Sequence, residues 1–392
     1  MTGKIKLGII GMGNMGKEHA KNVALRGKCP SVELVAVADI APKALNWAKE
    51  NLPESVALFD DAEKMMDSGL IDTCLVAVPH YYHPYYALEG FKRGINVLIE
   101  KPAGVYTRQV REMNEAAAKA NVKFGIMFNQ RTDPLYAKAR EIVRSGQLGN
   151  LKRMVWIITN WYRTQAYYDS GSWRGSWKGE GGGVLLNQAP HNLDLWQWIC
   201  GMPKKISASC VIGKYHDIGV EDDVTIFGEY ENGATATFIT TTGEFPGTNR
   251  LEISGELGKI VVEGGKLKWW KLDRNEREIC ATEKNGFYSA EPEYIEFEEK
   301  VVLGHPIILE NFANAILNGA EMIAPGEDGI NSLTLSNAAY LSTWTGKTID
   351  LPVNEAEFEG YLKELCDKEP PAKKKTFEGS EENCAERWKI RW

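Results

Sequence analysis

The first part of the chain alternates short apolar runs with longer stretches in which apolar residues recur at helical spacing. The apolar runs are nearly continuous and rich in β-branched residues, as in strands that helices cover on both faces. They occupy residues 5–10, 33–38, 73–78, 96–99 and 123–128. Helices are expected between them, over residues 15–26, 42–51, 84–93 and 107–120. This alternation predicts an α/β domain with a doubly wound, parallel sheet.

The pattern changes after about residue 133. Longer runs then alternate apolar and polar residues, which is typical of strands with one exposed face. These runs are residues 151–162, 206–212, 224–230, 234–242, 250–254 and 259–263, with Asn232-Gly233 as a hairpin turn between two of them. Helices are expected over residues 134–145, 185–200, 307–317 and 330–345. We therefore predict a second, α+β domain with a large, mainly antiparallel, open-faced sheet.

Composition and charge exclude several classes of protein. Apolar residues form 43% of the chain and charged residues 25%, close to the globular average, so most of the length should fold. A net charge of −7 argues against nucleic-acid binding, which needs a basic face. No stretch approaches the ~18 apolar residues of a membrane span, so we expect a cytoplasmic protein without membrane contact. The seven cysteines include no CxxC pair, and we expect neither a disulfide framework nor a metal site.

A glycine-rich segment directly follows the first predicted strand and begins the first predicted helix. It has the GxGxxG form Gly11-Met12-Gly13-Asn14-Met15-Gly16. Its glycines allow a tight turn, close approach of a pyrophosphate and packing of helix on strand. Asp39 ends the second strand, where a carboxylate can accept both ribose hydroxyls and repels a 2′-phosphate. These residues predict NAD as the cofactor; NADP is less favoured, although Lys43 could pair with a phosphate.

Two further segments end strands at the same, carboxyl, edge of the predicted sheet. Pro79-His80-Tyr81-Tyr82-His83 follows the third strand, and Glu100-Lys101-Pro102 follows the fourth. Open α/β sheets bind their ligands at this edge. His80 and His83 could hold a metal, but no carboxylate or cysteine cluster accompanies them, so we expect a capping or cofactor-contact role. Lys101 is expected to be functional rather than a surface charge.

A later block completes a recognisable set of motifs. It runs Gly181-Gly182-Gly183-Val184-Leu185-Leu186-Asn187-Gln188-Ala189-Pro190-His191-Asn192-Leu193-Asp194. With the glycine-rich segment, Asp39 and Glu100-Lys101-Pro102, it resembles the Gfo/Idh/MocA oxidoreductases over roughly residues 4–353. The resemblance implies an N-terminal Rossmann domain that binds NAD(P). It also implies a C-terminal sheet domain that holds the substrate and often forms the oligomer interface.

The resemblance implies roles for individual residues. Lys101 is expected to contact the reacting oxygen and the nicotinamide side, and His191 to act as the acid/base. Asn187, His191 and Asp194 are spaced i, i+4 and i+7, which would place them on one face of the predicted helix. The family usually has Asp in place of Asn187, which leaves the catalytic part of this residue open. Asp194 either orients His191 or makes a structural hydrogen bond.

The expected site residues form three groups. The catalytic residues are Lys101, His191 and Asn187. The cofactor contacts are the glycine-rich segment, Asp39, Pro79, His80, His83, Glu100, Lys101 and Asn129. The substrate contacts are Lys101, Arg131, Tyr162, Arg163, Trp173, Arg174, Asn187 and His191. Asn129 and Arg131 are included because they are similar to family positions at the nicotinamide end.

Tryptophans suggest the kind of substrate. Six of the 12 Trp residues fall within residues 151–200. In residues 160–164 and 173–177, aromatic faces beside Arg and Asn suit the CH faces and hydroxyls of a sugar or cyclitol. Trp156, Trp196 and Trp198 are expected to pack the sheet core or a subunit interface, whereas either a pocket or this packing role is open to Trp161, Trp173 and Trp177.

These observations predict three parts and one function. The parts are an NAD(P)-binding Rossmann domain (1–128), a substrate-binding and oligomerisation domain (129–353) and a charged extension (354–392). An open sheet face would leave apolar area in water, so we expect a dimer or tetramer. The expected reaction is NAD-dependent oxidation of a secondary hydroxyl of a sugar, sugar derivative or inositol to a ketone. The alternatives are an NAD-retaining glycosidase that works by oxidation and elimination, and a nonenzymatic NAD-responsive regulator.

Overall fold

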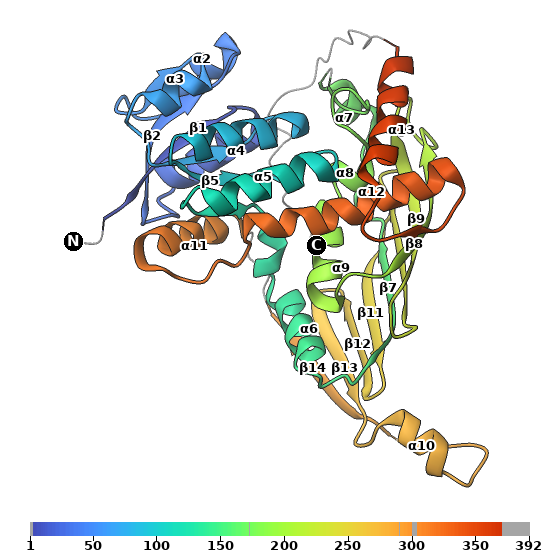
Figure 1. Cartoon of the computed structure of the whole chain (residues 1–392). Helices are drawn as coiled ribbons and strands as arrows, with labels where there is room; N and C mark the ends of the chain where they lie inside the picture. The colour runs from blue at the N-terminus through green and yellow to red at the C-terminus, as the bar shows by residue number, and fades with distance from the viewer. Residues whose placement is uncertain (1–2, 172, 290, 300–303, 371–392) are drawn as a thin grey trace. The chain divides into compact units, whose positions relative to one another are not determined.

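The computed structural model of the chain describes residues 3–171, 173–289, 291–299 and 304–370 (Figure 1). Contacts divide the chain into two compact units. Among the described residues, the first unit comprises 3–132 together with 179–181 and 304–333, and the second comprises 133–171, 173–178, 182–289, 291–299 and 334–370. Each unit is built around one sheet. Residues 371–392 of the predicted extension lie outside the described residues.

The sheet of the first unit is parallel throughout, in the order β3-β2-β1-β4-β5-β6. Its strands are β1 (Ile5–Ile10), β2 (Val32–Ala38), β3 (Ala57–Phe59), β4 (Thr73–Val76), β5 (Asn96–Ile99) and β6 (Phe124–Ile126). This order is that of a Rossmann fold, and it confirms the predicted doubly wound sheet. Only β3 is missing from the prediction of these strands, because its apolar run of three residues is too short to identify a strand.

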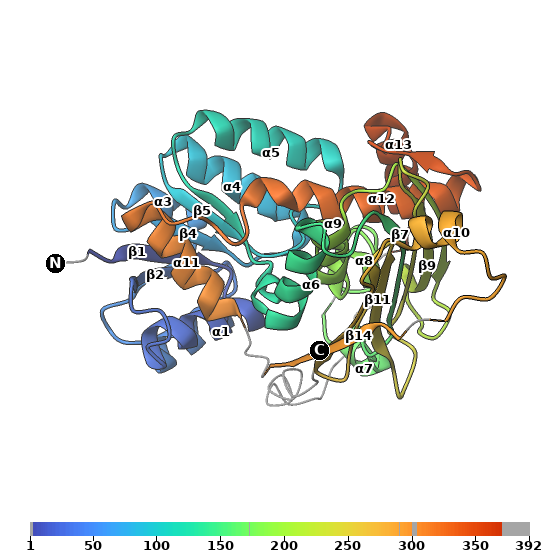
Figure 2. The same ribbon diagram turned by 90° about the horizontal axis from the view of Figure 1, so that it is seen from below.

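Helices cover both faces of this sheet (Figure 2). α4 (His83–Lys92) and α5 (Thr107–Lys119) pack together on one face, and α1 (Asn14–Ala20) and α11 (His305–Asn318) contact β1 on the other. α2 (Pro42–Asn51) packs on β3, and α3 (Ala62–Asp67) packs on β1, β2 and β3. This cover on both faces explains why the strands form continuous apolar runs in the sequence.

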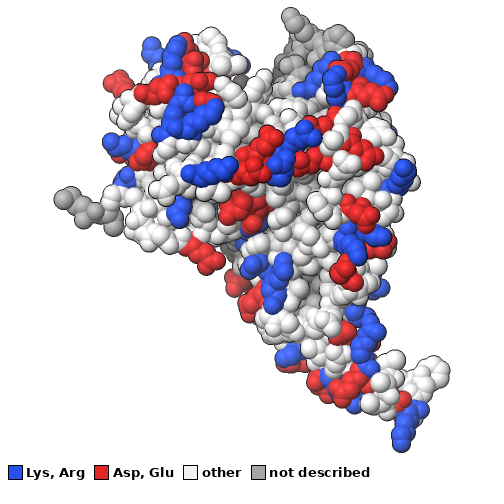
Figure 3. All heavy atoms as spheres, in the orientation of Figure 1, with Lys and Arg blue, Asp and Glu red and all other residues white. Residues whose placement is uncertain are grey.

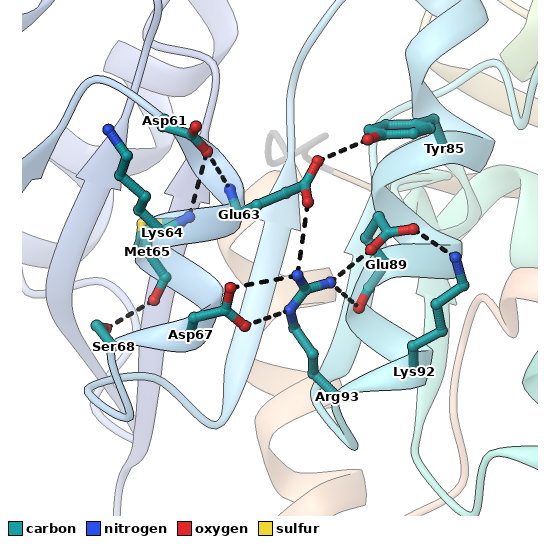
Figure 4. Close-up of polar contacts among 10 residues, drawn as sticks. All are labelled: Asp61, Glu63, Lys64, Met65, Asp67, Ser68, Tyr85, Glu89, Lys92 and Arg93. Atoms are coloured by element: carbon teal, nitrogen blue, oxygen red, sulfur yellow. Dashed lines mark hydrogen bonds and ion pairs between the residues drawn. The ribbon is translucent and has the colours of Figure 1, made fainter.

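Side-chain ion pairs join α3 to α4 (Figure 4). Arg93, at the end of α4, donates to Asp67 of α3 (2.7 Å) and to Glu89 of α4 (2.6 Å). Tyr85 donates to Glu63 of α3 (2.6 Å). The side chains of Asp67 and Glu63 are 62% and 41% exposed, so the ion pairs between the two helices contribute little by themselves.

The segment that begins at residue 304 returns to the first sheet. Pro325 forms an isolated bridge with Gly125 of β6. Arg131, which is 3% exposed, donates to the Asp328 carboxylate (2.7 Å) and to the carbonyl oxygen of Ile323 (3.1 Å). The two units defined by contacts therefore differ from the predicted contiguous domains. The difference arises because residues 304–333, which are distant in sequence, pack with the first unit.

The sheet of the second unit has nine strands, in the order β14-β13-β12-β11-β7-β10-β9-β8-β15. They are β7 (Leu151–Ile158), β8 (Lys205–Ile212), β9 (Glu221–Glu229), β10 (Thr235–Thr241), β11 (Asn249–Gly255), β12 (Gly258–Glu263), β13 (Lys266–Lys271), β14 (Glu293–Glu298) and β15 (Ile349–Asp350). β7 and β10 pair in parallel, and the other neighbours are antiparallel. The predicted mainly antiparallel sheet is confirmed, and Asn232-Gly233 lies in the turn between β9 and β10.

The remaining helices belong wholly or mainly to the second unit. They are α6 (Pro134–Arg144), α7 (Gln165–Asp169), α8 (Val184–Asn187), α9 (Pro190–Cys200), α10 (Glu276–Thr282), α12 (Gly329–Thr345) and α13 (Glu355–Lys368). Across the described residues, no helix combines the length and apolarity needed to cross a membrane. On the face drawn in Figure 3, basic and acidic side chains are interspersed.

Two of the predicted core tryptophans lie at the centre of the second unit. Trp156 and Trp196 are at most 1% exposed, and both rings contact Phe238. Their indole N–H groups donate to Asn249 and Tyr230, respectively, which satisfies the only polar atom of each ring. Trp198, expected in the sheet core or at a subunit interface, is only half-buried, so it is not a fully buried core residue of this unit.

Candidate active site

The glycine-rich segment joins β1 to α1, as the sequence predicts. A β-carbon at Gly11 would lie 2.5 Å from the Ala77 carbonyl oxygen, and one at Gly16 would lie 1.8 Å from that of Gly11. Both positions therefore require glycine. Around Gly13, apart from its chain neighbours, no atom of the described residues would lie within 4 Å of a β-carbon. This open space at the second glycine suits close approach of a pyrophosphate.

Asp39 lies beside the glycine-rich segment and holds it from the end of β2. Its Oδ2 accepts a hydrogen bond from the Met12 amide (2.7 Å), and its Oδ1 accepts one from the Ala41 amide (2.8 Å). Each carboxylate oxygen has a further lone pair that a ribose hydroxyl could use. The geometry is therefore compatible with both a loop-positioning and a ribose-binding role.

The two histidines that follow β4 contact backbone carbonyl groups. Nδ1 of His80 lies 2.8 Å from the Glu180 oxygen, and the two ring nitrogens of His83 lie 2.7 Å from the oxygens of Pro102 and Val78. Burial lowers the pKa of His83, which favours a neutral ring that donates one of these bonds. Among the residues that the structure describes, no group of three or more His, Cys, Asp or Glu could hold a metal ion.

Glu100 takes part in a buried cluster that sequence reasoning missed. Its Oε1 lies 2.7 Å from Nε2 of His19 on α1, and the His19 ring meets that of His305 at 5.7 Å. Burial opposes ionisation of Glu100, but the hydrogen bond to His19 and the nearby His305 and Lys101 outweigh it and lower its pKa to about 2. Glu100, the residue directly before Lys101, is thus held by α1. The sequence signal that could have revealed this cluster was a histidine, His19, three residues after Gly16.

Asn129 and Arg131 follow β6 at the same sheet edge and are 7% and 3% exposed. The guanidinium of Arg131 is bound by the Asp328 carboxylate. Its expected contact with the substrate stays a prediction. Within the described residues, Oδ1 of Asn129 has no hydrogen-bond partner. A buried acceptor without a protein partner is left to bond a water molecule or a ligand, which is compatible with the predicted cofactor contact.

In the second unit, Asn187 and His191 lie on different helices. Asn187 ends α8, and His191 is the second residue of α9, so the prediction of one helix over 185–200 is wrong. Pro190 explains the break, because proline lacks the N–H that a continuing helix needs and favours the first turn of a new one. Both side chains are 8% exposed. Asp194 accepts a hydrogen bond from Gln197 (2.9 Å), a structural contact.

Tyr167 connects the expected substrate residues of the second unit, and the sequence analysis did not select it. Its hydroxyl accepts hydrogen bonds from Arg174 (2.6 Å) and Gln188 (3.1 Å) and donates one to Asn187 (3.4 Å). The Arg174 guanidinium also lies over the Tyr167 ring, at 4.3 Å from its centre. Tyr167 therefore links Arg174 to Asn187 through one oxygen. Its aromatic type and its place between Tyr162 and Trp173 were the only signals.

The remaining expected substrate residues differ in exposure. Tyr162 is 42% exposed, and Arg163 donates to the Tyr162 carbonyl oxygen (2.8 Å). Trp173 is half-buried, with the Arg174 guanidinium 4.5 Å from its ring centre. Trp161 and Trp177 are at most 4% exposed, which places them in the core of the second unit.

Glu221 holds the start of α8 from β9. Its carboxylate, with the residue 0% exposed, accepts hydrogen bonds from the amides of Gly183 (2.8 Å) and Leu185 (3.0 Å) and from the Tyr340 hydroxyl (2.8 Å). Burial raises the pKa of this carboxyl to about 7, although the three hydrogen bonds oppose the change. Glu221 thus positions the short helix that ends in Asn187.

Comparison with known sequences assigns the chain to a family. Residues 5–128 match the family described as "Oxidoreductase family, NAD-binding Rossmann fold", and residues 136–261 match "GFO/IDH/MocA C-terminal domain". The chain therefore belongs to the Gfo/Idh/MocA oxidoreductases and carries their NAD-binding Rossmann domain. This confirms the resemblance stated from the motifs.

Several individual proteins are similar over most of the chain. Inositol 2-dehydrogenase of Rhizobium meliloti (strain 1021) is 24% identical over 88% of this chain and 99% of its own. Myo-inositol 2-dehydrogenase of Thermotoga maritima is 25% identical over 88% and 98%. The crystal structure of the WlbA dehydrogenase from Bordetella pertussis, in complex with NADH and UDP-GlcNAcA, is 26% identical, covers 90% of this chain and 100% of its own, and gives a TM-score of 0.76.

Replacing Glu221 by Gln tests whether its carboxyl is protonated in the folded protein. Because its pKa is raised from 4.5 to about 7, the folded state holds a proton that the unfolded state releases. This group therefore stabilises the wild-type fold below pH 4.5 and loses that contribution as the pH rises to about 7.

The free energy of unfolding of wild type relative to Glu221→Gln should fall by on the order of 3 kcal/mol across this range and then stay level. Urea unfolding of both proteins between pH 4.5 and 8 measures it. Other titrating groups cancel in the difference, and a difference that is independent of pH would contradict the prediction.

Proposed function

We propose that this oxidoreductase uses NAD to oxidise a secondary hydroxyl of a sugar, a sugar derivative or an inositol to a ketone. The observation that supports the proposal best is the set of residues at the carboxyl edge of the first sheet. The glycine-rich segment follows β1, Asp39 follows β2 and Lys101 follows β5. A phosphate-binding turn, a ribose-binding carboxylate and a cation at one edge suit a dinucleotide and a reacting oxygen.

The residues present fit NAD in two respects. The open space at Gly13 leaves room for a pyrophosphate, and the buried Oδ1 of Asn129 offers an acceptor that no described residue uses. The carboxylate of Asp39 would repel the 2′-phosphate of NADP, which favours NAD. When bound, NAD supplies the nicotinamide C4 that accepts a hydride.

Lys101 and His191 would divide the remaining chemistry between them. The ammonium of Lys101 would stabilise negative charge that develops on the substrate oxygen. His191 would take the hydroxyl proton, because the unperturbed pKa of imidazole lies close to neutral pH. Asn187, held by Tyr167, would hydrogen-bond a further substrate hydroxyl.

The similar proteins support a polyhydroxylated substrate. Two relatives are named for inositol, and the WlbA structure holds a nucleotide sugar. In this chain, the exposed Tyr162 and the half-buried Trp173 supply aromatic faces, and Arg174 supplies hydrogen-bond donors beside them. Such a combination suits the CH faces and hydroxyls of a ring.

Purified protein incubated with NAD and a panel of inositols, hexoses and glycosides should produce NADH, measured by its absorbance. Lys101→Ala and His191→Ala should each lower kcat by about 100-fold or more, because each removes a group that acts in the transition state. Lys92→Ala, which removes an exposed lysine of the first unit, is the matched control and should retain full activity.

NAD binding without reduction on any compound would contradict the proposal. Cleavage of a glycoside without net NADH would instead select the glycosidase alternative. A biological response that is unimpaired in the Lys101→Ala variant would favour the alternative of a nonenzymatic NAD-responsive regulator.

Asp39→Asn tests the cofactor preference. The amide keeps one acceptor oxygen but loses the charge that repels a 2′-phosphate. The ratio of the Kd for NADPH to the Kd for NADH should therefore fall by about tenfold, which corresponds to ~1.4 kcal/mol. Fluorescence titration of both nucleotides measures it, with Asp67→Asn on α3 as the control. An unchanged ratio would show that Asp39 does not select the cofactor.

The open face of the second sheet supports a homo-oligomer. Ile157 of β7 pairs with Ile239 of β10, both are partly exposed, and Phe227 of β9 is 41% exposed on a nearby strand. By their register, these three apolar side chains lie on one face of the sheet, and exposed apolar residues grouped on one face favour an interface. We infer a dimer or tetramer in which a second copy covers this face. Light scattering should give at least twice the chain mass of 43.8 kDa, and a monomer at micromolar concentration would contradict the inference.

A further inference from the structure

The charged extension, to which the sequence assigns no chemistry, contacts the loop that carries two predicted substrate residues, Trp173 and Arg174. α13 ends at Lys368, and the carboxylate of the next residue, Glu369, accepts hydrogen bonds from two consecutive amides. These are the amides of Trp177 (2.8 Å) and Lys178 (2.9 Å). Nζ of Lys178 donates in return to the Glu369 carbonyl oxygen (3.3 Å). Residues 173–178 are hereafter called the substrate loop.

The backbone of the substrate loop also contacts the turn at residues 218–219. The amide of Gly219 donates to the Gly175 carbonyl oxygen (2.9 Å). Gly175 has φ +64°, and a β-carbon there would also meet Ile218 at 2.9 Å, so this contact requires glycine. The backbone of the loop thus follows the 218–219 turn closely. A β-carbon at Gly219 would lie 3.1 Å from Oε1 of Glu369, so the carboxylate packs on the same turn.

An aromatic cluster joins the loop to α13. The Trp177 ring meets those of Tyr340 (5.4 Å) and Trp344 (5.7 Å) on α12. Trp344 in turn stacks on Phe358 of α13 (5.3 Å). The apolar contacts place α13 against the loop, and Glu369 then completes the contact with charge-assisted hydrogen bonds, which are stronger than neutral ones.

The position of the loop determines where Arg174 lies. Arg174 comes three residues before Trp177 and donates to the Tyr167 hydroxyl, which donates to Asn187. The contacts therefore continue from Glu369 through the loop to Arg174, Tyr167 and Asn187. All of these residues belong to the second unit.

We propose that Glu369 is a positioning residue that holds the substrate loop, and with it Trp173 and Arg174, in the arrangement that binds the sugar or cyclitol. The substrate part of this inference rests on the proposed function. Without the carboxylate, two adjacent backbone amides lose their acceptor, and the loop can leave the 218–219 turn. Glu369 then determines substrate affinity through the loop rather than by contacting the reacting atoms.

Limited trypsin digestion tests the inference without any assumption about the reaction. Arg174 and Lys178 are cleavage sites within the substrate loop. Glu369→Gln preserves size but replaces one acceptor oxygen by a donor NH₂ group, which faces an amide donor. Cleavage after Arg174 and Lys178, followed by mass spectrometry, should become about tenfold faster, the factor that ~1.4 kcal/mol of lost hydrogen bonding produces.

The matched control is Glu364→Gln, which breaks an exposed ion pair with Lys368 on the same helix. The control should be cleaved at the wild-type rate. Equal cleavage rates in both variants would overturn the proposal. Circular dichroism and the melting temperature identify general unfolding, and Glu369→Ala provides a second variant.

Steady-state kinetics form the second arm. Glu369→Gln should raise KM for the sugar or cyclitol about tenfold, with the Kd for NAD unchanged and kcat lowered less than threefold. An equal loss in NAD affinity would overturn the positioning role, because it would indicate damage to the whole protein. If no compound in the panel is oxidised, the proposed function fails, while the digestion result still decides whether Glu369 holds the loop.

Discussion

Carboxylates that accept hydrogen bonds from two backbone amides hold the loops of the candidate active site. Asp39 binds Met12 and Ala41, Glu221 binds Gly183 and Leu185, and Glu369 binds Trp177 and Lys178. Loops lack the regular hydrogen bonds of a sheet or helix, so a loop amide that is shielded from water needs another partner. One carboxylate satisfies two amides and fixes the distance between them. Each of these three contacts joins a segment that carries expected cofactor or substrate residues.

The expected site residues of the two units are held in place in different ways. In the first unit, Lys101 and Asn129 follow buried parallel strands, whose positions the sheet determines. In the second unit, Arg174 and Asn187 lie on a loop and at the end of a four-residue helix, which long-range contacts must hold. The fold itself does not select the substrate, since relatives named for inositol and a structure that holds a nucleotide sugar share it over 88–90% of this chain.

The first unit was largely predictable because its signals are local. Continuous apolar runs identify buried strands. The glycine-rich segment and Asp39 occur at the spacing that is typical of a dinucleotide-binding motif. The predicted helix over 185–200 shows the limit of such reasoning. Its apolar pattern continues through the break at Pro190, so periodicity joined two helices and placed Asn187 and His191 on one face. Tyr167 was missed because its role depends on hydrogen bonds to Arg174, Gln188 and Asn187, which only the folded chain brings to its hydroxyl.

The sequence alone determined the family, the parallel sheet with its nucleotide-binding motif and the mainly antiparallel second sheet. These features depend on hydrophobic periodicity and on short motifs, which neighbouring residues encode together. The tertiary structure decided which distant residues complete the site. Glu221 lies 38 residues from Gly183, and Glu369 lies 192 residues from Trp177. An isolated glutamate in a sequence carries no sign of its partner, because an exposed charge and a loop-holding carboxylate have the same side chain.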